Sequence, residues 1–311
     1  MKKILVIGSS NTDLITNVVR FPNAGETISG KAFMQAMGGK GANQAVAAQR
    51  LGGNVKFVTC LGNDANGRNT LAYFRNEGLD VSSALVVDYA PTGTAIILVN
   101  DEGENCIVVT PGANHELLPG HISELEDEIA KAAMIVLQME IPFETVKKVI
   151  ECAHKHRTPV LLNVAPARQI GIDLFKMIDI LVVNETEIEC ISGQSIAKLG
   201  EEGIIDQLVS MGANTVILTL GKRGCIVKTS TMMKYIAAFE VEAVDTTAAG
   251  DTFCGALVAG LAQGKDIFEA ARFATAASAI CVTRMGAQPS IPTGEEVATF
   301  LKKNLSVKPI V

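Results

Sequence analysis

Short apolar segments typical of buried strands alternate with segments typical of helices along most of this 311-residue chain. Near-continuous apolar strands joined by helices are characteristic of parallel sheets whose two faces are both covered. We therefore expect an α/β fold in which helices flank both faces of a central, mostly parallel sheet. The predicted strands span residues 3–8, 55–60, 134–137, 160–162, 180–183 and 215–218, and the predicted helices span residues 44–51, 65–76, 143–156, 185–192, 250–263 and 267–284.

Two regions, residues 14–37 and 92–110, depart from this alternation. Each contains short β-type runs, and Asn100-Asp101-Glu102-Gly103 between two of them is typical of a hairpin loop. We expect the two regions to form one small β-sheet inserted in a single domain that comprises residues 1–311. Such a sheet can act as a lid, and its strand edges or face can pair with another subunit.

The composition of the chain argues against several classes of protein. A formal net charge of −6 disfavours a nucleic-acid-binding surface. No apolar run approaches the ~20 residues of a membrane helix, and the four apolar residues after Lys3 are too few for a signal peptide. The seven cysteines lie at least 27 residues apart, and neither they nor the four histidines have the spacing of a metal site. We therefore expect a cytoplasmic protein with free, mostly buried thiols.

One stretch, residues 244–253, has the composition of an anion-binding loop that leads into a helix. Ala248, Ala249 and Gly250 have small side chains or none, so a phosphate can approach their backbone, and the amides of a helix N-terminus favour an anion. Asp251 follows directly. A carboxylate beside a phosphate disfavours simple binding, but it can accept a proton from an attacking hydroxyl. The alternative is that Asp251 is only an acidic residue at a helix N-terminus.

Polar residues also follow other predicted strands, at the edge where open α/β sheets bind ligands. Asn11 and Asp13 follow the first strand, and Gln138-Met139-Glu140 follows the strand at residues 134–137. Asn11 and Asp13 either bond a polyol or form an ordinary turn. Gly38-Gly39-Lys40-Gly41-Ala42-Asn43 allows close backbone approach to a sugar or phosphate, although it matches neither a P-loop nor a dinucleotide-binding motif.

Three further segments each allow a functional and a structural interpretation. Asn184 and Glu187 either organise hydrated Mg²⁺ or form a capping box at a helix N-terminus. Residues 219–224 either contact a nucleotide or form a glycine turn between strands. Carbonyl oxygens of residues 279–290, together with Asp245, either hold a monovalent cation or simply end a helix.

Taken together, these motifs resemble those of the PfkB (ribokinase-like) family of carbohydrate kinases. Asp245-Thr-Thr-Ala-Ala-Gly-Asp251 is similar to the C-terminal signature of the family, and residues 38–43, continued by Gly52 and Gly62, are similar to its N-terminal signature. Asn184-Glu-Thr-Glu187 is similar to the family's Asn-x-x-Glu motif. The resemblance covers about residues 3–304 and is strongest to members that act on D-ribose, through Asn11-Thr-Asp13, residues 38–48, Gly103-Glu-Asn105 and Gly286-Ala-Gln-Pro-Ser290.

This resemblance implies ATP-dependent phosphorylation of D-ribose at its 5-hydroxyl, with Mg²⁺, an activating K⁺ and a homodimer formed through the lid. It implies that Asp251 is the general base and that the anion hole consists of Ala248, Ala249 and Gly250. The implied sugar-binding residues are Asn11, Asp13, Gly39, Lys40, Gly41, Ala42, Asn43, Glu140 and Asp251. The implied ATP-binding residues are Asn184, Glu187, Thr219, Leu220, Gly221, Lys222, Arg223, Gly224, Gly250 and Thr275. The implied K⁺ site, built mostly from backbone oxygens, comprises Asp245, Thr247, Cys281, Arg284, Gly286 and Ser290.

Two residues depart from those common in the family. Thr275 stands where His or Asn often lies near the adenine, so its shorter side chain weakens that expected contact. Cys254 stands where Asn is common, and only a packing effect is expected there.

Two other functions stay open. One is a kinase for another small sugar or a nucleoside, and the other is a catalytically silent sugar or nucleotide sensor. Few aromatic residues lie near the sugar motifs to stack on a base, which disfavours a nucleoside. A sensor needs no base, so the presence of Asp251 beside an anion loop disfavours that function.

Overall fold

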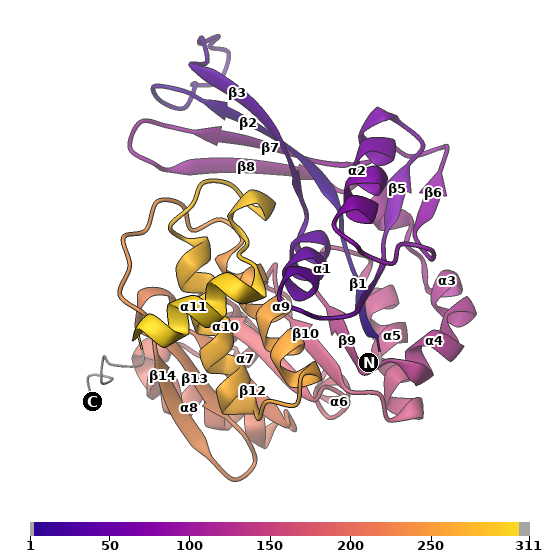
Figure 1. The fold of residues 1–311 in the computed structure, drawn as a ribbon, viewed down its shortest axis with the longest axis vertical. Helices are drawn as coiled ribbons and strands as arrows, with labels where there is room; N and C mark the ends of the chain where they lie inside the picture. Colours follow the sequence, from indigo (N-terminus) through magenta and orange to yellow (C-terminus); the bar gives the residue numbers. More distant parts are fainter. Residues whose placement is uncertain (1–2, 305–311) are drawn as a thin grey trace.

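The computed structural model of this protein describes residues 3–304. An eight-stranded sheet lies at its centre, in the order β14-β13-β12-β11-β10-β9-β1-β4 (Figure 1). Neighbouring strands from β4 across to β12 are parallel, whereas β13 and β14 extend the edge as antiparallel hairpins. The prediction of a mostly parallel sheet is confirmed. The strands are β1 Ile4–Ile7, β4 Val55–Val58, β9 Met134–Leu137, β10 Val160–Asn163, β11 Ile180–Asn184, β12 Thr215–Thr219, β13 Gly224–Lys228 and β14 Met233–Ala237.

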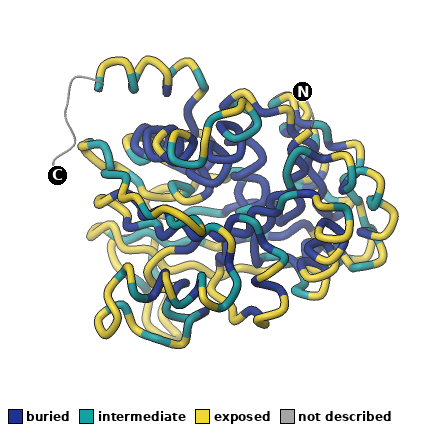
Figure 2. Tube along the Cα trace, turned by 90° about the horizontal axis from the view of Figure 1, so that it is seen from below, coloured by how far each residue is buried: buried dark blue, intermediate teal, exposed yellow. Residues whose placement is uncertain are grey.

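Helices cover both faces of this sheet because successive residues of a strand point to opposite sides. Ile4 and Val6 of β1 belong to one buried core, and Leu5 and Ile7 belong to the other. Figure 2 shows these buried segments enclosed by a more exposed surface. The helices over the first core are α1 Lys40–Arg50, α2 Ala65–Asn76, α9 Ala249–Ala262, α10 Ile267–Cys281 and α11 Gly294–Asn304; those over the second are α3 Pro119–Glu124, α4 Glu126–Lys131, α5 Phe143–His156, α6 Ile172–Phe175, α7 Glu185–Ser192 and α8 Ile196–Ser210.

A second sheet of four strands projects from the main body, in the order β3-β2-β7-β8 (Figure 1). Its strands come from the two regions expected to form a small sheet. The segment after β1 continues directly into this sheet, so Asn11 and Asp13 lie in a strand and the turn interpretation is wrong. In the first of these regions, β3 begins only at Ala32. The four strands are β2 Asn11–Asn17, β3 Ala32–Gly38, β7 Gly93–Val99 and β8 Asn105–Thr110.

Several elements differ from what the sequence indicates. The strand expected at residues 55–60 ends at Val58, and β5 (Cys60–Gly62) pairs with β6 (Leu85–Val87) in a separate two-stranded sheet. α1 begins at Lys40, four residues before the helix expected at residues 44–51. Gly41 and its neighbours are therefore already helical. The sequence pattern does not predict α8. Gly200 lies inside this helix and interrupts it, with a φ of 72°.

Within residues 3–304, no helix combines the length and hydropathy needed to cross a membrane. The seven cysteines are free, and all except Cys106 and Cys190 are buried, as expected.

Candidate active site

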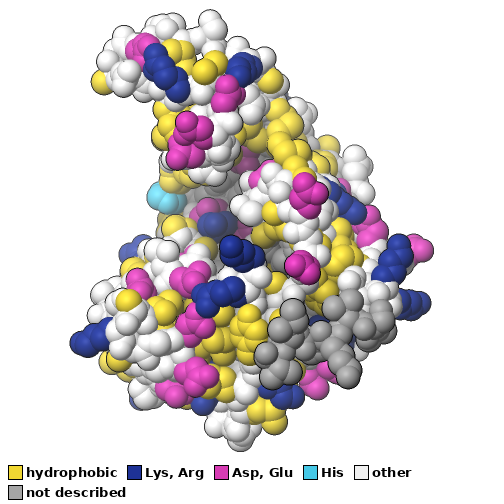
Figure 3. All heavy atoms as spheres, turned by 90° about the vertical axis from the view of Figure 1, so that its left-hand side faces the viewer, with side chains coloured by type: hydrophobic (Ala, Val, Ile, Leu, Met, Phe, Trp, Pro, Cys, Tyr) yellow, Lys and Arg dark blue, Asp and Glu magenta, His cyan; other side chains and the backbone are white. Residues whose placement is uncertain are grey.

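Polar side chains gather at the carboxyl ends of the parallel strands, where open α/β sheets bind ligands. The order of the sheet reverses at β1, because β4 lies on one side of it and the later strands β9 to β12 lie on the other. Asn11 and Asp13 follow β1 at this reversal, and Glu140 follows β9. Asn184 and Thr219 end β11 and β12. Figure 3 shows a recess between the projecting sheet and the main body, with acidic and basic side chains near its floor.

Asp251 lies in the first turn of α9, with 7% of its surface exposed. Its two carboxylate oxygens accept hydrogen bonds from two residues of α1. Asn43 Nδ2 donates to Oδ2 at 2.9 Å, and Gln44 Nε2 donates to Oδ1 at 2.9 Å. Because α1 packs against α9, the helix pair holds the carboxylate in one orientation. A carboxylate oxygen has two acceptor positions, so Asp251 can still accept a bond from one more hydroxyl.

Further buried amides hold these two donors. Gln138 Nε2 donates to Gln44 Oε1 at 2.7 Å, and Gln288 Nε2 donates to Asn43 Oδ1 at 3.1 Å. Each bond to an amide oxygen fixes that amide with its NH₂ group towards Asp251. The sequence singles out neither Gln44 nor Gln288 as a functional residue. Both lie in runs that resemble the family, residues 38–48 and 286–290, but the resemblance assigns neither of them a role.

Asp13, Lys40 and Glu140 surround the same space as Asp251. Burial, followed by the charges of Glu140 and Asp251, raises the pKa of Asp13 to about 7. The charge of Asp251 raises the pKa of Lys40, and Glu140 acts in the same direction. The site therefore combines several carboxyl groups that act on one another with one ammonium group. This arrangement suits a ligand that is rich in hydroxyl groups, because hydroxyls can donate to carboxylates and accept from an ammonium.

Glu140 also fixes the start of α1. Its Oε2 accepts a hydrogen bond from Ser9 Oγ at 2.5 Å and another from the backbone N–H of Lys40 at 3.0 Å. A carboxylate at a helix N-terminus satisfies amides that have no partner within the helix. Glu140 thus positions the helix that carries Asn43 and Gln44.

The glycines of the run at residues 38–43 are needed for close packing within the protein. A Cβ at Gly41 would lie 2.6 Å from the backbone that follows β1, and a Cβ at Gly38 would overlap the carboxylate of Asp13. Gly39 has a φ of 91°, which other residues rarely adopt. Ala42 is fully buried in the core beneath α1. At these glycines and at Ala42, only the backbone can contact a sugar, and such a contact stays a prediction.

Asn11 is buried, and Asn114 orients it. Asn114 Nδ2 donates to Asn11 Oδ1 at 2.8 Å. The same amide accepts from the backbone N–H of Ser10 at 2.8 Å and donates to its carbonyl at 3.1 Å. Asn114 lies in the 3-10 helix η1 (Gly112–Glu116), outside every recognised motif, so the sequence gives no reason to select it.

The anion loop enters α9 through a left-handed residue, Ala248, with a φ of 59°. The side of Gly250 is open, because a Cβ built there would meet no atom within 4 Å. The first amides of a helix have no acceptor within it, so the first turn of α9, which begins at Ala249, can meet an anion on this open side. Asp251, by contrast, is bonded by two side chains of another helix. A role as a mere helix-terminal charge does not account for those contacts.

Asn184 and Glu187 form a capping box at the start of α7. Asn184 Oδ1 accepts from the backbone N–H of Glu187, and the backbone N–H of Asn184 donates to Glu187 Oε2, each at 2.8 Å. The structural interpretation of this motif is therefore confirmed. Glu187 is buried, and burial raises its pKa. The capping box involves Oε2 of Glu187, so Oε1 can accept a bond from a metal-bound water.

Residues 219–224 form the turn between β12 and β13, as the structural interpretation predicted. Leu220 is buried in the core, whereas Lys222 and Arg223 are exposed. Arg223 forms ion pairs with Glu185 and Glu201, which hold it on the surface. A nucleotide contact in this turn would therefore come from its backbone or from Lys222.

Thr275 is buried on α10, where its hydroxyl donates to the carbonyl of Ala271 at 2.9 Å. It also lies 3.9 Å from the Sγ of Cys225 on β13. This hydroxyl is already bonded within its own helix. A contact between Thr275 and the adenine stays a prediction.

Asp245, the carboxylate of the expected K⁺ site, lies between two backbone segments. Asp245 Oδ1 accepts from the N–H of Thr247 at 2.9 Å and from its hydroxyl at 2.6 Å. Oδ2 accepts from the N–H of Gly286 at 2.8 Å. These bonds lower the pKa of Asp245 despite its burial, and they join the loop before α9 to the loop after α10.

Two further residues of that expected site lie close to each other. Cys281 Sγ lies 2.9 Å from Ser290 Oγ, so both residues face the same buried space. Arg284 instead directs its guanidinium to Glu296 on α11. Arg284 can therefore contribute only through its backbone.

Comparisons with known proteins find relatives that align with nearly the whole chain. The chain matches the model of the pfkB family of carbohydrate kinases over residues 1–294. The ribokinase of Haemophilus influenzae is 41% identical over 305 residues, which cover 97% of this chain and 99% of that relative. A deoxyribokinase of Salmonella typhi is 37% identical over 303 residues, which cover 97% of this chain and 99% of that relative.

A solved structure has the same fold over nearly its full length. The ribokinase of Arabidopsis thaliana, determined in complex with ribose and ATP, has a TM-score of 0.90 and a sequence identity of 32%. The match covers 97% of this chain and 99% of that one. With a family model that spans residues 1–294 and relatives that align over almost their whole length, the chain belongs to the PfkB family of carbohydrate kinases.

Proposed function

We propose that this protein, as a single kinase domain, transfers the γ-phosphoryl group of ATP to the 5-hydroxyl of D-ribose and releases D-ribose 5-phosphate and ADP. Its relatives support this activity, since those named ribokinase are 36–41% identical to it over nearly their full length. The observation that carries the proposal is the buried carboxylate of Asp251, held by two amides beside an open helix N-terminus. Phosphoryl transfer to an alcohol needs these two features side by side.

In this mechanism Asp251 accepts the proton of the 5-hydroxyl while the oxygen of that hydroxyl forms a bond to the γ-phosphorus. The bond between that phosphorus and the β–γ bridging oxygen breaks, and ADP leaves with the bond's electron pair. The donors Asn43 and Gln44 keep the carboxylate oriented, because each donates a hydrogen bond to one of its two oxygens. The backbone of Ala248, Ala249 and Gly250 faces the negative charge of the transferring group.

The sugar would lie where the projecting sheet joins the main body. It would be surrounded there by Asn11, Asp13, Lys40, Asn43 and Glu140. These side chains are polar, buried or half-buried, and drawn from β2, α1 and the segment after β9. Three of them are held by other residues, since Ser9 donates to Glu140, Asn43 donates to Asp251, and Asn114 donates to Asn11. The set of donors and acceptors is therefore rigid. Such a set distinguishes hydroxyl positions by geometry, because an unmatched buried polar group is costly.

Two kinds of cation fit the residues present. Asn184 and Glu187 offer oxygen atoms, which are what the water shell of Mg²⁺ bonds, and Mg²⁺ would neutralise the phosphate charge. The loop around Asp245 offers a carboxylate and backbone carbonyls, which suits K⁺ rather than a transition metal. Asp245 accepts a bond from Thr247 in the segment that precedes α9. K⁺ bound beside Asp245 would therefore also order the anion loop.

The projecting sheet would act as a lid, and we propose that two copies dimerise through it. Asp13 pairs in register with Ala95, which pairs with Val109, so these residues share the face towards the site. The opposite face exposes large apolar side chains among polar ones: Phe33, Ile96 and Val108 have 66%, 51% and 59% of their surfaces accessible. Apolar exposure of this kind marks an interaction surface.

The first test measures ADP release by the purified protein with Mg-ATP and either K⁺ or Na⁺. D-ribose, 2-deoxyribose, fructose and adenosine are compared with a reaction that lacks sugar. We expect strong turnover with D-ribose, and faster turnover in K⁺ than in Na⁺. Turnover with another acceptor would keep the chemistry and replace the substrate. Ligand binding without turnover would support the sensor function and contradict the proposal.

We also propose a cytoplasmic location. The free cysteines support it, because seven unpaired thiols suit a reducing compartment.

A further inference from the structure

A group of three different potential metal ligands lies at the junction of α4 and α5. Cys152 and His156 are four residues apart on α5, so their side chains lie on the same side of that helix. Glu126 begins α4, which packs against α5. A carboxylate oxygen of Glu126, the Sγ of Cys152 and a ring nitrogen of His156 all lie within 4.8 Å of one another. Among residues 3–304 these are the only three or more such side chains that converge in this way.

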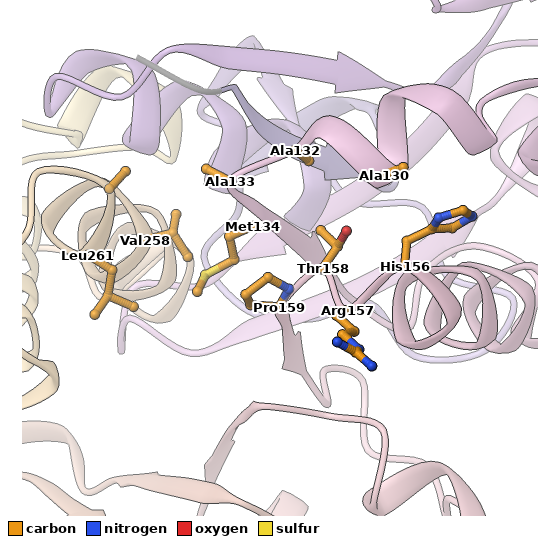
Figure 4. Close-up of a pocket in the computed structure, with 11 residues that line it drawn as sticks. Ala130, Ala132, Ala133, Met134, His156, Arg157, Thr158, Pro159, Val258 and Leu261 are labelled. Carbon is orange, nitrogen blue, oxygen red and sulfur yellow. The ribbon is translucent and has the colours of Figure 1, made fainter.

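The cluster is far from Asp251 in the architecture of the sheet. α5 ends at His156, immediately before β10, and therefore at the amino ends of the strands. Figure 4 shows His156 at one end of a cavity of about 600 Å³ in this region, with its ring directed away from Val258 and Leu261 of α9. The proposed kinase residues lie at the carboxyl ends of the same strands, so the two sites are separate.

Burial gives the cluster an inner and an outer side. Cys152 has 8% of its surface exposed and belongs to the core beneath α5. The side chains of Glu126 and His156 are 40% and 28% exposed. An ion in solution can therefore reach the carboxylate and the imidazole directly, and the thiol lies at the inner edge to complete its coordination.

The present hydrogen bonds leave ligand atoms available. Lys155 Nζ donates to Oε1 of Glu126 at 2.7 Å, and Nε2 of His156 lies 2.7 Å from that same oxygen. Both contacts involve Oε1, so Oε2 can bind an ion while Lys155 keeps its bond. His156 needs only to exchange its bond to Glu126 for a bond to the ion.

We propose that Glu126, Cys152 and His156 bind one zinc-class divalent cation, with water as the fourth ligand. One oxygen, one sulfur and one nitrogen donor suit a tetrahedral, borderline-soft ion such as Zn²⁺ or Co²⁺. Mg²⁺ prefers six oxygen ligands, so the cation that accompanies ATP does not compete here. On binding, the Cys152 thiol releases its proton to solvent and the thiolate bonds the ion. The bound ion joins α4 to α5 and stabilises the folded chain.

Co²⁺ is the probe for the test, because a Co²⁺–thiolate bond produces a ligand-to-metal absorption band in the near ultraviolet. Cys106 is exposed and could also bind metal, so every protein carries Cys106→Ser. In that background we expect one Co²⁺ per chain with the thiolate band. Cys152→Ser should abolish the band, and His156→Ala should weaken Co²⁺ binding by at least about tenfold. The matched control is His154→Ala, which alters an exposed histidine of the same helix and should bind Co²⁺ normally.

A second readout keeps the proposal testable if a variant is less stable. Excess Zn²⁺ should raise the Tm of the Cys106→Ser protein and of its His154→Ala derivative, but not the Tm of the His156→Ala or Glu126→Gln derivative. Each variant is compared with itself without metal, so lost folding stability does not imitate the result. Absence of the thiolate band, or equal Co²⁺ affinity in the His156→Ala and His154→Ala proteins, would overturn the proposal. Neither measurement depends on kinase activity.

Discussion

At the scale of single residues, Asp251→Asn separates proton transfer from binding. The substitution keeps the size of the side chain but removes the proton acceptor, and its new NH₂ group faces Asn43 or Gln44, which are themselves donors. We expect turnover to fall by roughly 10²–10⁴-fold, with ribose and ATP binding retained. Steady-state kinetics and calorimetric binding measure the two effects. Near-normal turnover would show that another group accepts the proton.

Gln44→Leu tests whether the amide network positions that base. The change removes the donor to Asp251 Oδ1 and leaves Gln138 without its acceptor. A hydrogen bond to a charged group is worth about 1.5–3 kcal/mol, so we expect kcat to fall by roughly 10–100-fold with little change in the KM for ATP. Steady-state kinetics and thermal unfolding of the variant measure the effect. A lower Tm with an unchanged kcat would indicate a purely structural role.

The raised pKa of Asp13 predicts a pH-dependent sugar affinity. Its pKa is about 7 in the folded protein against an ordinary value of 3.8, so the carboxyl group becomes ionised as the pH rises through 7. Ionised Asp13 accepts hydrogen bonds from sugar hydroxyls, and the KM for the sugar should therefore fall over that range. Asp13→Asn should raise the KM and make it nearly independent of pH between 6 and 8. A parallel pH dependence in the two proteins would assign the effect to another group.

The same residue affects folding stability with a defined sign. The folded protein binds a proton at Asp13 more tightly than the unfolded chain does, so this contribution to stability is complete below about pH 4 and is lost as the pH rises to about 7. The Tm of the Asp13→Asn protein should lack that decline. Ligand-free protein must be used, because a bound sugar would relieve the cost of ionised Asp13.

At the scale of elements, two glycines distinguish packing from ligand binding. A Cβ at Gly41 would lie 2.6 Å from the backbone after β1, whereas a Cβ at Gly250 would meet nothing within 4 Å. Gly41→Ala should therefore destabilise the fold by about 1–3 kcal/mol and displace the start of α1. Gly250→Ala should leave the Tm unchanged or slightly higher.

Kinetic measurements on the Gly41→Ala and Gly250→Ala proteins test the second role, ligand binding. The added methyl group of Gly250→Ala occupies the open side of the anion loop, so we expect kcat/KM for ATP to fall at least roughly tenfold. Thermal unfolding and ATP kinetics are measured on both proteins. Full activity of Gly250→Ala would mean that the phosphate lies elsewhere.

Sequence patterns locate the regular elements better than the contacts between them. The helices α2, α5 and α7 have the expected limits, because each has a continuous amphipathic pattern between clear boundaries. α8 is missed because Gly200 breaks its pattern. Motifs select Asp251 and Asn43, whereas Gln44 and Asn114 are found only in three dimensions. Their roles depend on partners 207 and 103 residues away, and no local pattern encodes such a distance.

At the scale of the whole molecule, the outer face of the lid should hold two copies together. Val108 is 59% exposed on that face and pairs in register with Ile96. A charge at this position would be buried without a partner in a dimer, so Val108→Lys should convert a dimer to a monomer in light-scattering measurements. Ile172→Lys is the control, since Ile172 is 56% exposed on α6, outside the projecting sheet. Equal masses for both variants would place the dimer contact elsewhere.

The packing of α1 against α9 also has a consequence for synthesis of the chain on the ribosome. Asn43 and Asp251 are bonded but lie 208 residues apart, and α1 emerges long before its partner helix exists. At translation rates of about 5–20 residues per second, that interval lasts roughly 10–40 seconds. Throughout it, the alanine-rich side of α1 has no neighbour from α9 to cover it. A nascent chain that stalls before residue 251 therefore exposes this helix to chaperones and to aggregation, however stable the finished enzyme is.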